Sequence, residues 1–472
     1  MEGKKVIVLG GGLPGLSAAH WLTRQGVETE VLERASEAGG LARTIERNGF
    51  RYDFGGYRFF SRSPEIQHLL EELLGPDLQQ VKASSKIFYR ERLYEYPLSP
   101  RDIYAGLGRQ QAGLALWSFA GTRVAGALRR APFQNLEDWL VAEFGETLFR
   151  AFFKDYNEKV WGLPCHRLAA ELASQRIRGL SLRGTLGQVL LPRRVLADPS
   201  SSYEFLYPRL GIGQLTGRFA AAIAKKNTIR TDASVVEVRV KRARAESVVF
   251  HDAGGRDIEV PGTDVISSIP LPRLLYLLNP RPPADVLASA RSLMFRDLIA
   301  VCLELRRDRV TKDSWIYVPE PGIAFARVLE PKNWSADMAP AERTSLVAEH
   351  YCFEGDATWA QTDQELVART IADLADKMKL ISREEVVSGF AMRIKKPYPV
   401  YEVGYRDHLI RIQRYLRSIV NLQTVGRGGM FKYYNVGHLV ESGIRAAENV
   451  FGAGHDLSGV PVDAVVSGTF RE

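Results

Sequence analysis

The chain has 472 residues, of which 45% are hydrophobic and 25% are charged, and these proportions exclude a mainly disordered protein. At roughly 100–200 residues per domain, the length predicts two to four domains. Lys and Arg number 63 against 55 Asp and Glu, which gives a formal net charge of +8. This modest excess favours an anionic partner without selecting its kind.

The cysteines and histidines exclude several classes of site. Cys165, Cys302 and Cys352 are odd in number and widely spaced, which excludes a disulfide framework and a zinc finger and favours a reducing, cytoplasmic location. The eight histidines lack metal-binding spacing, so we expect no metal. No apolar run approaches the roughly 20 residues that span a bilayer. Glycines at 10–12 interrupt the only signal-like stretch, so we interpret the start as a mature N-terminus.

The first third of the chain predicts a β-turn-α-β unit followed by helices. Lys4–Leu9 and Val27–Leu32 are short apolar strands, and Leu16–Gln25 between them has helical periodicity. Further helical patterns predict a mostly α-helical region; they occupy residues 63–74, 100–130, 136–153 and 167–178.

From residue 234 the pattern changes to strands. We expect them over residues 235–240, 247–251, 258–260, 264–269, 298–305 and 346–353, with a helix over 364–378. Near the end, Ile419–Val425 predicts a strand, Gly426–Gly429 a loop and Leu439–Val450 a helix. Alternating α and β at both ends around a different middle predicts one nucleotide-binding domain built from separated segments.

The first motif, Gly10-x-Gly12-x-x-Gly15, follows a predicted strand and opens a helix. Gly10 permits the tight turn, Gly12 allows a pyrophosphate to approach, and Gly15 allows close packing of helix on strand. Glu33 ends the second strand 18 residues after Gly15, where a carboxylate can bind a ribose. Together these features predict dinucleotide binding.

Two further glycine-rich segments indicate which dinucleotide binds. Gly39-Gly40-Leu41-x-Arg43 and Asp53-Phe54-Gly55-Gly56 follow Glu33 closely. A nicotinamide dinucleotide does not require them, whereas an extended FAD needs close backbone approach at its pyrophosphate, its ribityl chain and its ring. The alternative is a pair of surface turns. We predict FAD as the cofactor.

The segment 33–56 resembles the flavin amine oxidase and protoporphyrinogen oxidase superfamily. Four later segments are similar, in the same order, to UDP-galactopyranose mutases and mutase-like flavoproteins of polysaccharide biosynthesis. They are Phe152–Gly162 (FFKDYNEKVWG), Ala326–Trp334 (ARVLEPKNW), Lys396–Val400 (KPYPV) and Gly426–Asn435 (GRGGMFKYYN).

The motifs and the resemblance together imply three sets of site residues. The cofactor set is Gly10, Gly12, Gly15, Glu33, Gly39, Gly40, Leu41, Arg43, Gly56, Tyr57, Val236, Gly426, Arg427 and Asn435. The substrate set is Phe153, Tyr156, Trp161, Arg176 and Arg327. The catalytic set is Arg176, Arg327, Trp161, Tyr398 and Tyr433. In this scheme Tyr156 stacks on the nucleotide base, and the two arginines clamp the diphosphate.

Some residues have a purely structural alternative. Phe153 and Tyr156 have the helical spacing of core residues, Arg176 fits a solvated helix face, and Tyr398 fits the end of a strand. The sequence also departs from the mutases, because Tyr57 and Phe60 stand where that family has histidines. A phenol with a pKa of about 10 cannot carry protons near neutrality as an imidazole does.

The predicted fold is α/β, with a Rossmann-like FAD-binding domain of the glutathione-reductase type. We assign this domain to residues 1–85, 205–290 and 385–472, a helical substrate domain to 86–204, and a β-rich, antiparallel substrate domain to 291–384. These boundaries follow the changes of pattern along the chain.

The leading hypothesis is a UDP-galactopyranose mutase-type isomerase that changes the ring form of a nucleotide-diphosphate sugar through a flavin N5 adduct. The alternative is an FAD-dependent oxidoreductase of the amine oxidase or protoporphyrinogen oxidase kind; a flavin-binding regulator has little support. Expected partners are a nucleotide sugar or related anionic small molecule, NAD(P)H or another reductant as electron donor, and a second copy in a homodimer. We expect no nucleic acid and no membrane span.

Overall fold

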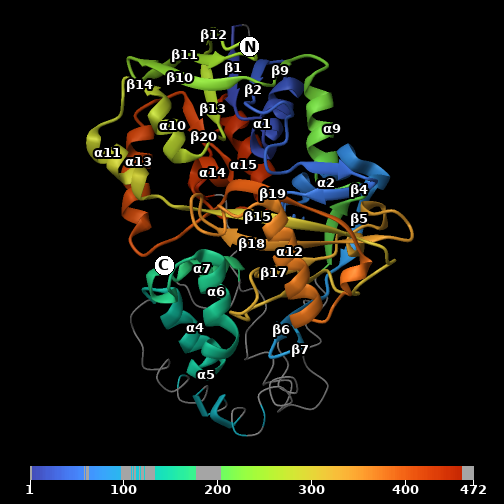
Figure 1. Cartoon of the computed structure of the whole chain (residues 1–472). Helices are drawn as coiled ribbons and strands as arrows, with labels where there is room; N and C mark the ends of the chain where they lie inside the picture. Colours follow the sequence, from blue (N-terminus) through green and yellow to red (C-terminus); the bar gives the residue numbers. More distant parts are fainter. Residues whose placement is uncertain are drawn as a thin grey trace.

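The computed structural model describes residues 3–57, 59, 63–96, 133–176 and 204–459, with isolated positions between 108 and 122. The predicted helix over 100–130 lies mostly outside these residues, and so does Phe60. Figure 1 shows two main parts, an upper one that holds the first strands and a lower one that holds the helices coloured teal.

The upper part contains a five-stranded parallel sheet with the order β20-β13-β1-β2-β9. Its strands are β1 (Lys5–Leu9), β2 (Glu28–Leu32), β9 (Thr228–Arg230), β13 (Asp264–Ser267) and β20 (Leu422–Thr424). Helices α1 (Leu13–Arg24), α9 (Gly213–Ile223) and α15 (Val436–Asn449) pack beside it, with α1 in contact with both of the others. This arrangement confirms the predicted Rossmann-like fold.

The central strand is apolar on both faces because helices cover the sheet. Val6, Ile7, Val8 and Leu9 are all fully buried. Helix α15 approaches α1 so closely that a methyl group on Gly443 would lie 2.1 Å from the carbonyl oxygen of Pro14 and 2.2 Å from Ser17 Oγ. The two helices therefore meet backbone to backbone.

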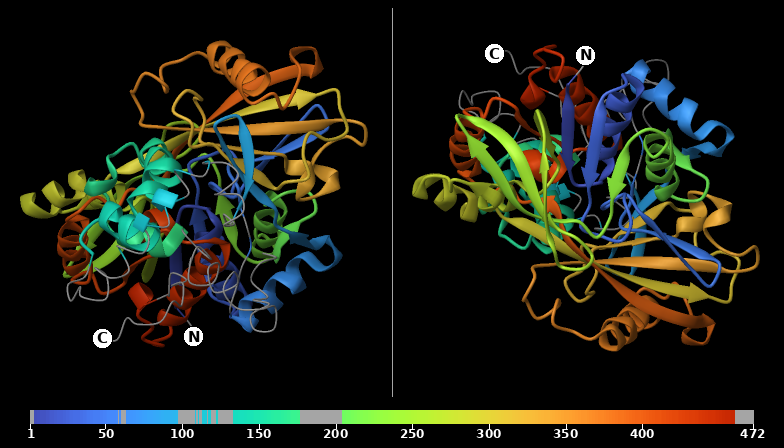
Figure 2. Two further views of the ribbon diagram at one scale, coloured as in Figure 1. Left: turned by 90° about the horizontal axis from the view of Figure 1, so that it is seen from below. Right: turned by 90° about the horizontal axis from the view of Figure 1, so that it is seen from above.

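The second large sheet has seven strands in the order β19-β15-β18-β17-β16-β6-β7. They are β6 (Ser85–Tyr89), β7 (Arg92–Glu95), β15 (Phe295–Leu305), β16 (Trp315–Tyr317), β17 (Arg327–Leu329), β18 (Thr344–Cys352) and β19 (Val386–Pro399). Every pairing is antiparallel except that of β6 with β16. Figure 2 shows this sheet beside the parallel one, with α12 (Asp363–Ala372) on its outer face.

The domain boundaries remain a prediction. Strand β19 begins at Val386, within the segment assigned to the FAD-binding domain, and pairs along its length with β15. Strand β6 lies, from its second residue on, within the segment assigned to the helical domain, and it pairs with β16.

A helical group follows the gap in the described chain. It consists of α4 (Leu136–Phe144), α5 (Glu146–Leu148), a π-helical turn (Phe149–Phe153), α6 (Lys154–Trp161) and α7 (Glu171–Arg176). One helix was predicted over 136–153, but Gly145 interrupts it with a φ of +79°, a conformation that favours glycine. Gly162, in the left-handed conformation, ends α6.

The remaining elements complete the framework around the two sheets. Two small antiparallel sheets are the hairpin of β3 (Thr44–Arg47) with β4 (Phe50–Asp53), and the pair of β5 (Leu78–Lys82) with β8 (Glu204–Pro208), which are distant in the sequence. A four-stranded sheet holds β10 (Ser234–Lys241), β11 (Arg244–His251), β12 (Asp257–Pro261) and β14 (Leu278–Asn279). The other helices are α2 (Pro64–Leu74), α10 (Leu271–Leu277), α11 (Ala284–Ser292), α13 (Tyr405–Leu416) and α14 (Gly426–Met430).

The predicted loop at Gly426–Gly429 was wrong, because these residues begin helix α14. Val425 is extended, and Gly426 has a φ of +76° that turns the chain directly from β20 into the helix. The four residues therefore form the start of a helix that faces the amino-terminal turn. Within the described part of the chain, no helix has both the length and the apolar character needed to cross a membrane.

The close contact of α1 with α15 gives a test of the framework. We expect Gly443→Ala to lower the free energy of unfolding by about 1–3 kcal/mol, because the new methyl group overlaps the backbone of α1. The matched control is Gly217→Ala in α9, where the methyl group meets no atom within 4 Å. Denaturant unfolding of both variants measures the difference, and equal stability would contradict the packing argument.

Candidate active site

The amino-terminal turn has the geometry of a phosphate cradle. A methyl group on Gly10 would lie 2.4 Å from Ser268 Oγ, and one on Gly15 would lie 2.1 Å from the carbonyl oxygen of Gly10. Beside Gly12, by contrast, the nearest atom would be 3.9 Å away. Helix α1 begins here without a side-chain cap and without an acidic residue in its first turn. Its positive end is therefore available to an anion.

Glu33 lies where the sequence predicts, directly after β2. Its Oε2 accepts a hydrogen bond from the N–H of Gly11 at 2.8 Å, and its Oε1 accepts one from the N–H of Ala35 at 2.9 Å. The carboxylate is buried beside the glycine turn. It is thus held at the position where a ribose hydroxyl group can reach it.

The second glycine segment packs onto the first. The N–H of Gly39 donates to the carbonyl oxygen of Gly11 at 2.7 Å, and a methyl group on Gly40 would lie 3.0 Å from Gly12 Cα. Arg43 Nε donates to the carbonyl oxygen of Gly40 at 3.0 Å. The side chain of Leu41 packs against two separate clusters of buried hydrophobic residues. The two segments form a single backbone surface.

The carboxy-terminal segment joins the same region. A methyl group on Gly426 would lie 2.5 Å from Pro14 Cγ, so α14 lies against the start of α1. Asn435 caps α15, its Oδ1 accepting from the N–H of His438 at 3.0 Å. Val236 lies at an irregularity in the pairing of β10 with β11, half-buried and apart from these contacts.

The glycine pair 55–56 brings the cofactor segments to the substrate sheet. A methyl group on Gly56 would lie 3.3 Å from Arg327 Nη2 and 3.2 Å from Trp334 Cη2. One on Gly55 would lie 3.9 Å from the hydroxyl oxygen of Tyr398. Residues far apart in the sequence therefore meet at this loop.

Arg327 forms a buried ion pair with Glu349. The two residues are register partners on β17 and β18, and Nε and Nη2 donate to the two carboxylate oxygens at 2.6 and 2.7 Å. The hydroxyl group of Tyr351 also donates to Glu349, at 2.9 Å. Burial alone would lower the pKa of Arg327, but the adjacent carboxylate raises it well above its usual value. The guanidinium is permanently charged, and Nη1 takes no part in the pair.

Aromatic rings surround the ion pair. Tyr398 and Tyr433 are stacked with centroids 5.7 Å apart and planes at 17°, and Trp161 meets Tyr433 edge-on at 6.2 Å. The guanidinium of Arg427 lies 4.9 Å from the centroid of the Tyr433 ring and donates to the carbonyl oxygens of Tyr434 and Pro397. The structure therefore brings together Arg327, Tyr398, Tyr433, Trp161 and Arg427.

The other predicted substrate residues have different surroundings. Tyr156 is half-buried, with its ring 5.5 Å from that of Tyr317. Phe153 is buried, and its ring stacks on Phe144 at 4.4 Å, a contact of the helical core. Arg176 ends α7, and its side chain lies outside the described residues.

Tyr57 and Asp53 are the buried titratable groups beside the glycine pair. Burial raises the pKa of Tyr57 far above its usual value, so the phenol stays protonated. Burial also raises the pKa of Asp53 to about 6, although Thr44, Tyr207 and the N–H of Ile212 donate hydrogen bonds to it. Burial thus disfavours the charged form of both groups.

Sequence reasoning missed Glu349 and Tyr351. The stretch Leu346–Phe353 was predicted only as a strand. The available signal was a glutamate in the middle of that strand, which the structure shows to be fully buried and therefore in need of a partner. Trp334, which donates through Nε1 to the carbonyl oxygen of Ser314 at 3.1 Å, was quoted as part of a motif without a role.

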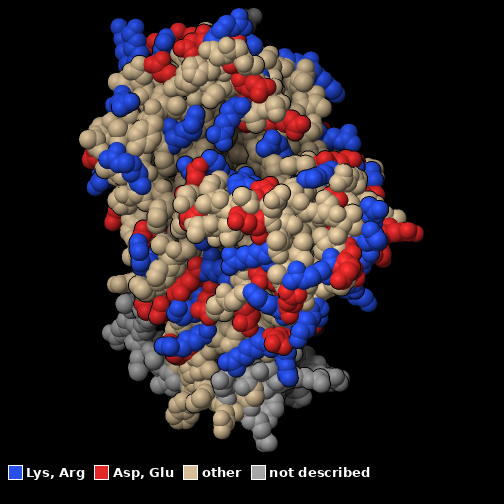
Figure 3. Space-filling model, in the orientation of Figure 1, with Lys and Arg blue, Asp and Glu red and all other residues tan. Residues whose placement is uncertain are grey.

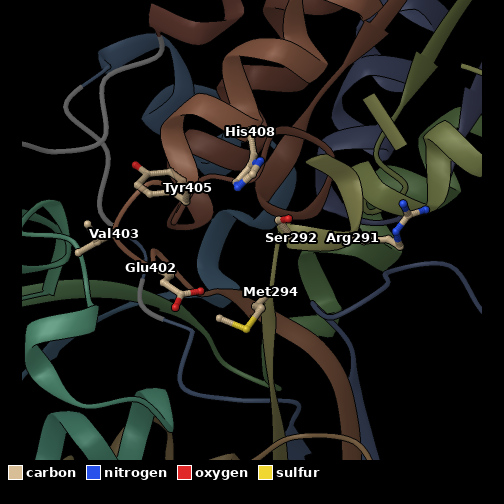
Figure 4. A pocket seen from close by; sticks show the side chains of 7 residues that line it. All are labelled: Arg291, Ser292, Met294, Glu402, Val403, Tyr405 and His408. Atoms are coloured by element: carbon tan, nitrogen blue, oxygen red, sulfur yellow. The ribbon is translucent and has the colours of Figure 1, made fainter. Parts of the chain in front are cut away.

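A separate pocket of about 280 Å³ lies between the end of α11 and the start of α13. Figure 4 shows Glu402 and Met294 on one side of it and His408 and Tyr405 on the other, while Arg291 extends away from them. Glu402 is paired with Arg167, with Nε and Oε1 3.1 Å apart. This pocket contains none of the predicted site residues.

The comparisons with known proteins identify a family for this chain. The family described as flavin containing amine oxidoreductase matches residues 13–451. Coproporphyrinogen III oxidase of Staphylococcus aureus is 22% identical over 481 aligned residues, 95% of this chain and 99% of that protein. Protoporphyrinogen oxidase 2 of Arabidopsis thaliana is 35% identical over 89 residues, 19% of this chain and 18% of that protein. The match spans at most 19% of the length of the first five curated relatives.

Two solved structures show the likeness in fold. Reduced UDP-galactopyranose mutase superposes with a TM-score of 0.83 and 22% identity, covering 97% of each chain. Putrescine oxidase bound to putrescine superposes with a TM-score of 0.63 and 18% identity, covering 95% of this chain and 99% of that one.

The residues present fit an extended FAD. The glycine turn is open beside Gly12, and Glu33 is fixed next to it. The segments at Gly40 and Gly56 continue the backbone surface toward Arg327. The fold and this cradle define an FAD-dependent flavoenzyme. The chain belongs to the flavin containing amine oxidoreductase family.

The raised pKa of Asp53 predicts a pH effect on stability. The folded-state pKa of about 6 exceeds the ordinary value of 3.8, so the stabilising contribution is complete below about pH 4 and is lost as the pH rises through 6. Relative to Asp53→Asn, the wild type should lose about 3 kcal/mol of unfolding free energy between these limits. Denaturant unfolding at several pH values measures this; parallel profiles would refute it.

Proposed function

We propose that this flavoenzyme acts on a nucleotide-diphosphate sugar and interconverts the ring forms of the sugar without net oxidation. One observation carries the proposal: Trp161, Arg327, Tyr398 and Tyr433, from four separate segments, gather at the glycine pair that continues the FAD cradle. The likeness in fold to UDP-galactopyranose mutase supports it.

Each residue of the cluster has a distinct role in this proposal. Arg327 meets the diphosphate through Nη1, because Nε and Nη2 are held by Glu349. The hydroxyl groups of Tyr398 and Tyr433 donate to phosphate oxygens, and Trp161 closes the sugar side. Reduced FAD supplies a nucleophilic N5 for the anomeric carbon.

Over the described residues of the face shown in Figure 3, no single basic patch dominates the surface. The proposed anionic ligand is therefore attracted by charges within the site itself. Figure 3 shows basic and acidic side chains interspersed over this face. Within the cluster, Arg427 adds a second guanidinium over the rings of Tyr398 and Tyr433, and its hydrogen bonds go to backbone carbonyls. This cation strengthens the binding of a diphosphate.

A second candidate function is oxidation of a substrate without a diphosphate. Two observations favour it: Glu349 neutralises Arg327, and Tyr57 is a buried phenol where mutases have a histidine. In this reading electrons pass from the substrate through FAD to an acceptor, and the nearly full-length similarity to coproporphyrinogen III oxidase supports the chemistry.

Anaerobic assays of the holoenzyme distinguish the two candidates. The mutase proposal predicts that dithionite-reduced enzyme converts a member of a UDP-sugar panel into a product of different ring size without consuming an acceptor. Chromatography of the products provides the measurement. Conversion that consumes one equivalent of acceptor per substrate would establish the oxidoreductase instead.

Arg327 is tested together with its buried partner. Arg327→Ala alone leaves Glu349 buried without a counter-charge, at a cost of about 3–5 kcal/mol of unfolding free energy. The double variant Arg327→Met/Glu349→Gln removes both charges and so leaves no unpaired buried charge. We expect both variants to lower turnover by roughly 10²–10³ while the protein retains FAD. Arg393→Ala, which removes an exposed ion pair on β19, is the control. Unchanged turnover in the double variant would exclude Arg327 from the site.

A further inference from the structure

Two cations, the half-buried Lys159 and the buried Arg296, hold helix α6 in place, and neither belongs to the predicted site. Lys159 Nζ donates to four backbone carbonyls, those of Val318, Glu320, Ile323 and Phe325, at 2.7–3.3 Å. An ammonium group has three hydrogens, so the four carbonyls share them. These carbonyls belong to the connection between β16 and β17, the strand that begins with Arg327.

The second cation, Arg296, contacts the backbone at the carboxy-terminal end of the same helix, next to Lys159. Its Nε donates to the carbonyl oxygen of Val160 at 3.0 Å, and Nη2 donates to those of Lys159 at 3.2 Å and Tyr351 at 2.9 Å. Its guanidinium carbon lies 4.2 Å from the centroid of the Phe353 ring. It thus satisfies the last carbonyls of α6 and connects them to β18.

Both cations lie close to residues of the candidate site. Arg296 is the register partner of Tyr398 in the pairing of β15 with β19, and the carbonyl group it binds at Val160 directly precedes Trp161. Helix α6 carries Trp161 of the cluster and Tyr156, which the sequence assigns to the substrate. It is therefore linked through Lys159 to the Arg327 side and through Arg296 to the Tyr398 side.

Removing these two charges from water costs desolvation free energy, which a cation on the protein surface would not lose. Desolvation lowers the pKa of Lys159 to about 8, against the opposing attraction of Glu320, Asp373 and Asp155. It also lowers the pKa of Arg296. Among the described residues, neither cation forms an ion pair within 4 Å, so backbone carbonyl dipoles and, for Arg296, the ring of Phe353 compensate their charges directly.

We propose that Lys159 and Arg296 are positioning residues. They fix α6 against the seven-stranded sheet before any ligand binds. They thereby set the spacing between Tyr156 and Trp161 on one side and Arg327 and Tyr398 on the other. The inference rests on the proposed function for the ligand that fills this space. It adds to that function the statement that α6 is held in one fixed position beside the ligand.

The test compares Lys159→Met with Lys154→Met, which removes a half-exposed lysine from the same helix, paired with Glu158. Hydrogen exchange of the FAD-loaded enzyme without ligand should show α6 protected in the wild type and in Lys154→Met. In Lys159→Met, exchange should rise in both 154–162 and 318–326. The Kd for UDP, from the change in flavin absorbance, should rise about tenfold or more in Lys159→Met only.

The FAD content should stay the same, because the cradle lies in the other sheet. Unchanged exchange in Lys159→Met would overturn the proposal. If the wild type itself does not bind UDP, the proposed function fails, and the exchange data alone decide the positioning role.

A second variant covers the case in which Lys159→Met does not fold. Arg296→Lys keeps the charge but loses the forked contact with α6 and β18, so we expect raised exchange at 154–162 with normal FAD content. Arg406→Lys, which conserves an exposed ion pair with Glu171, is the control. Wild-type exchange in Arg296→Lys would overturn the role of this residue.

Discussion

The buried pair of Arg327 and Glu349 is the interaction on which the candidate site depends. It places a permanent cation beside the glycine pair that continues the FAD cradle, and the carboxylate of Glu349 balances the charge of that cation. Neither residue can be buried alone without a cost of several kcal/mol, so each requires the other. The question of function is therefore whether the ligand uses the donor that the pair leaves over, Nη1, or whether the pair only shapes a neutral pocket.

The fold produces this pair by strand register and not by local sequence. Arg327 and Glu349 face each other because β17 and β18 are antiparallel partners, and Val328 and Leu329 continue the same register against Ala348 and Val347. The glycine pair reaches them because the absence of a side chain at Gly56 leaves room for the guanidinium. The parallel sheet holds the cofactor cradle, and the seven-stranded sheet holds the charge.

The sequence predicted what is local and missed what is not. The turn at Gly10–Gly15 and the acid at Glu33 were predictable because their spacing is set by one β-turn-α-β unit. The helical start at Gly426 was not, since four residues rich in glycine have no helical preference and contact with Pro14 determines their conformation. Glu349 and Arg296 were missed because their partners lie 22 and 136 residues away, at distances that only the folded chain defines.

The charges around the aromatic cluster follow one pattern. Lys159, Arg296 and Arg427 all donate to backbone carbonyls, and only Arg327 is matched by a buried carboxylate. Carbonyl dipoles orient a cation without cancelling its charge, whereas a carboxylate cancels it. Among the described residues near the rings, the uncompensated positive charge thus belongs to Arg427, stacked over Tyr433, and not to Arg327. In the proposed function, the anion is attracted by Arg427 and oriented by the fixed guanidinium of Arg327. The proposal thus divides attraction and alignment between two residues, where a single arginine clamp would combine them.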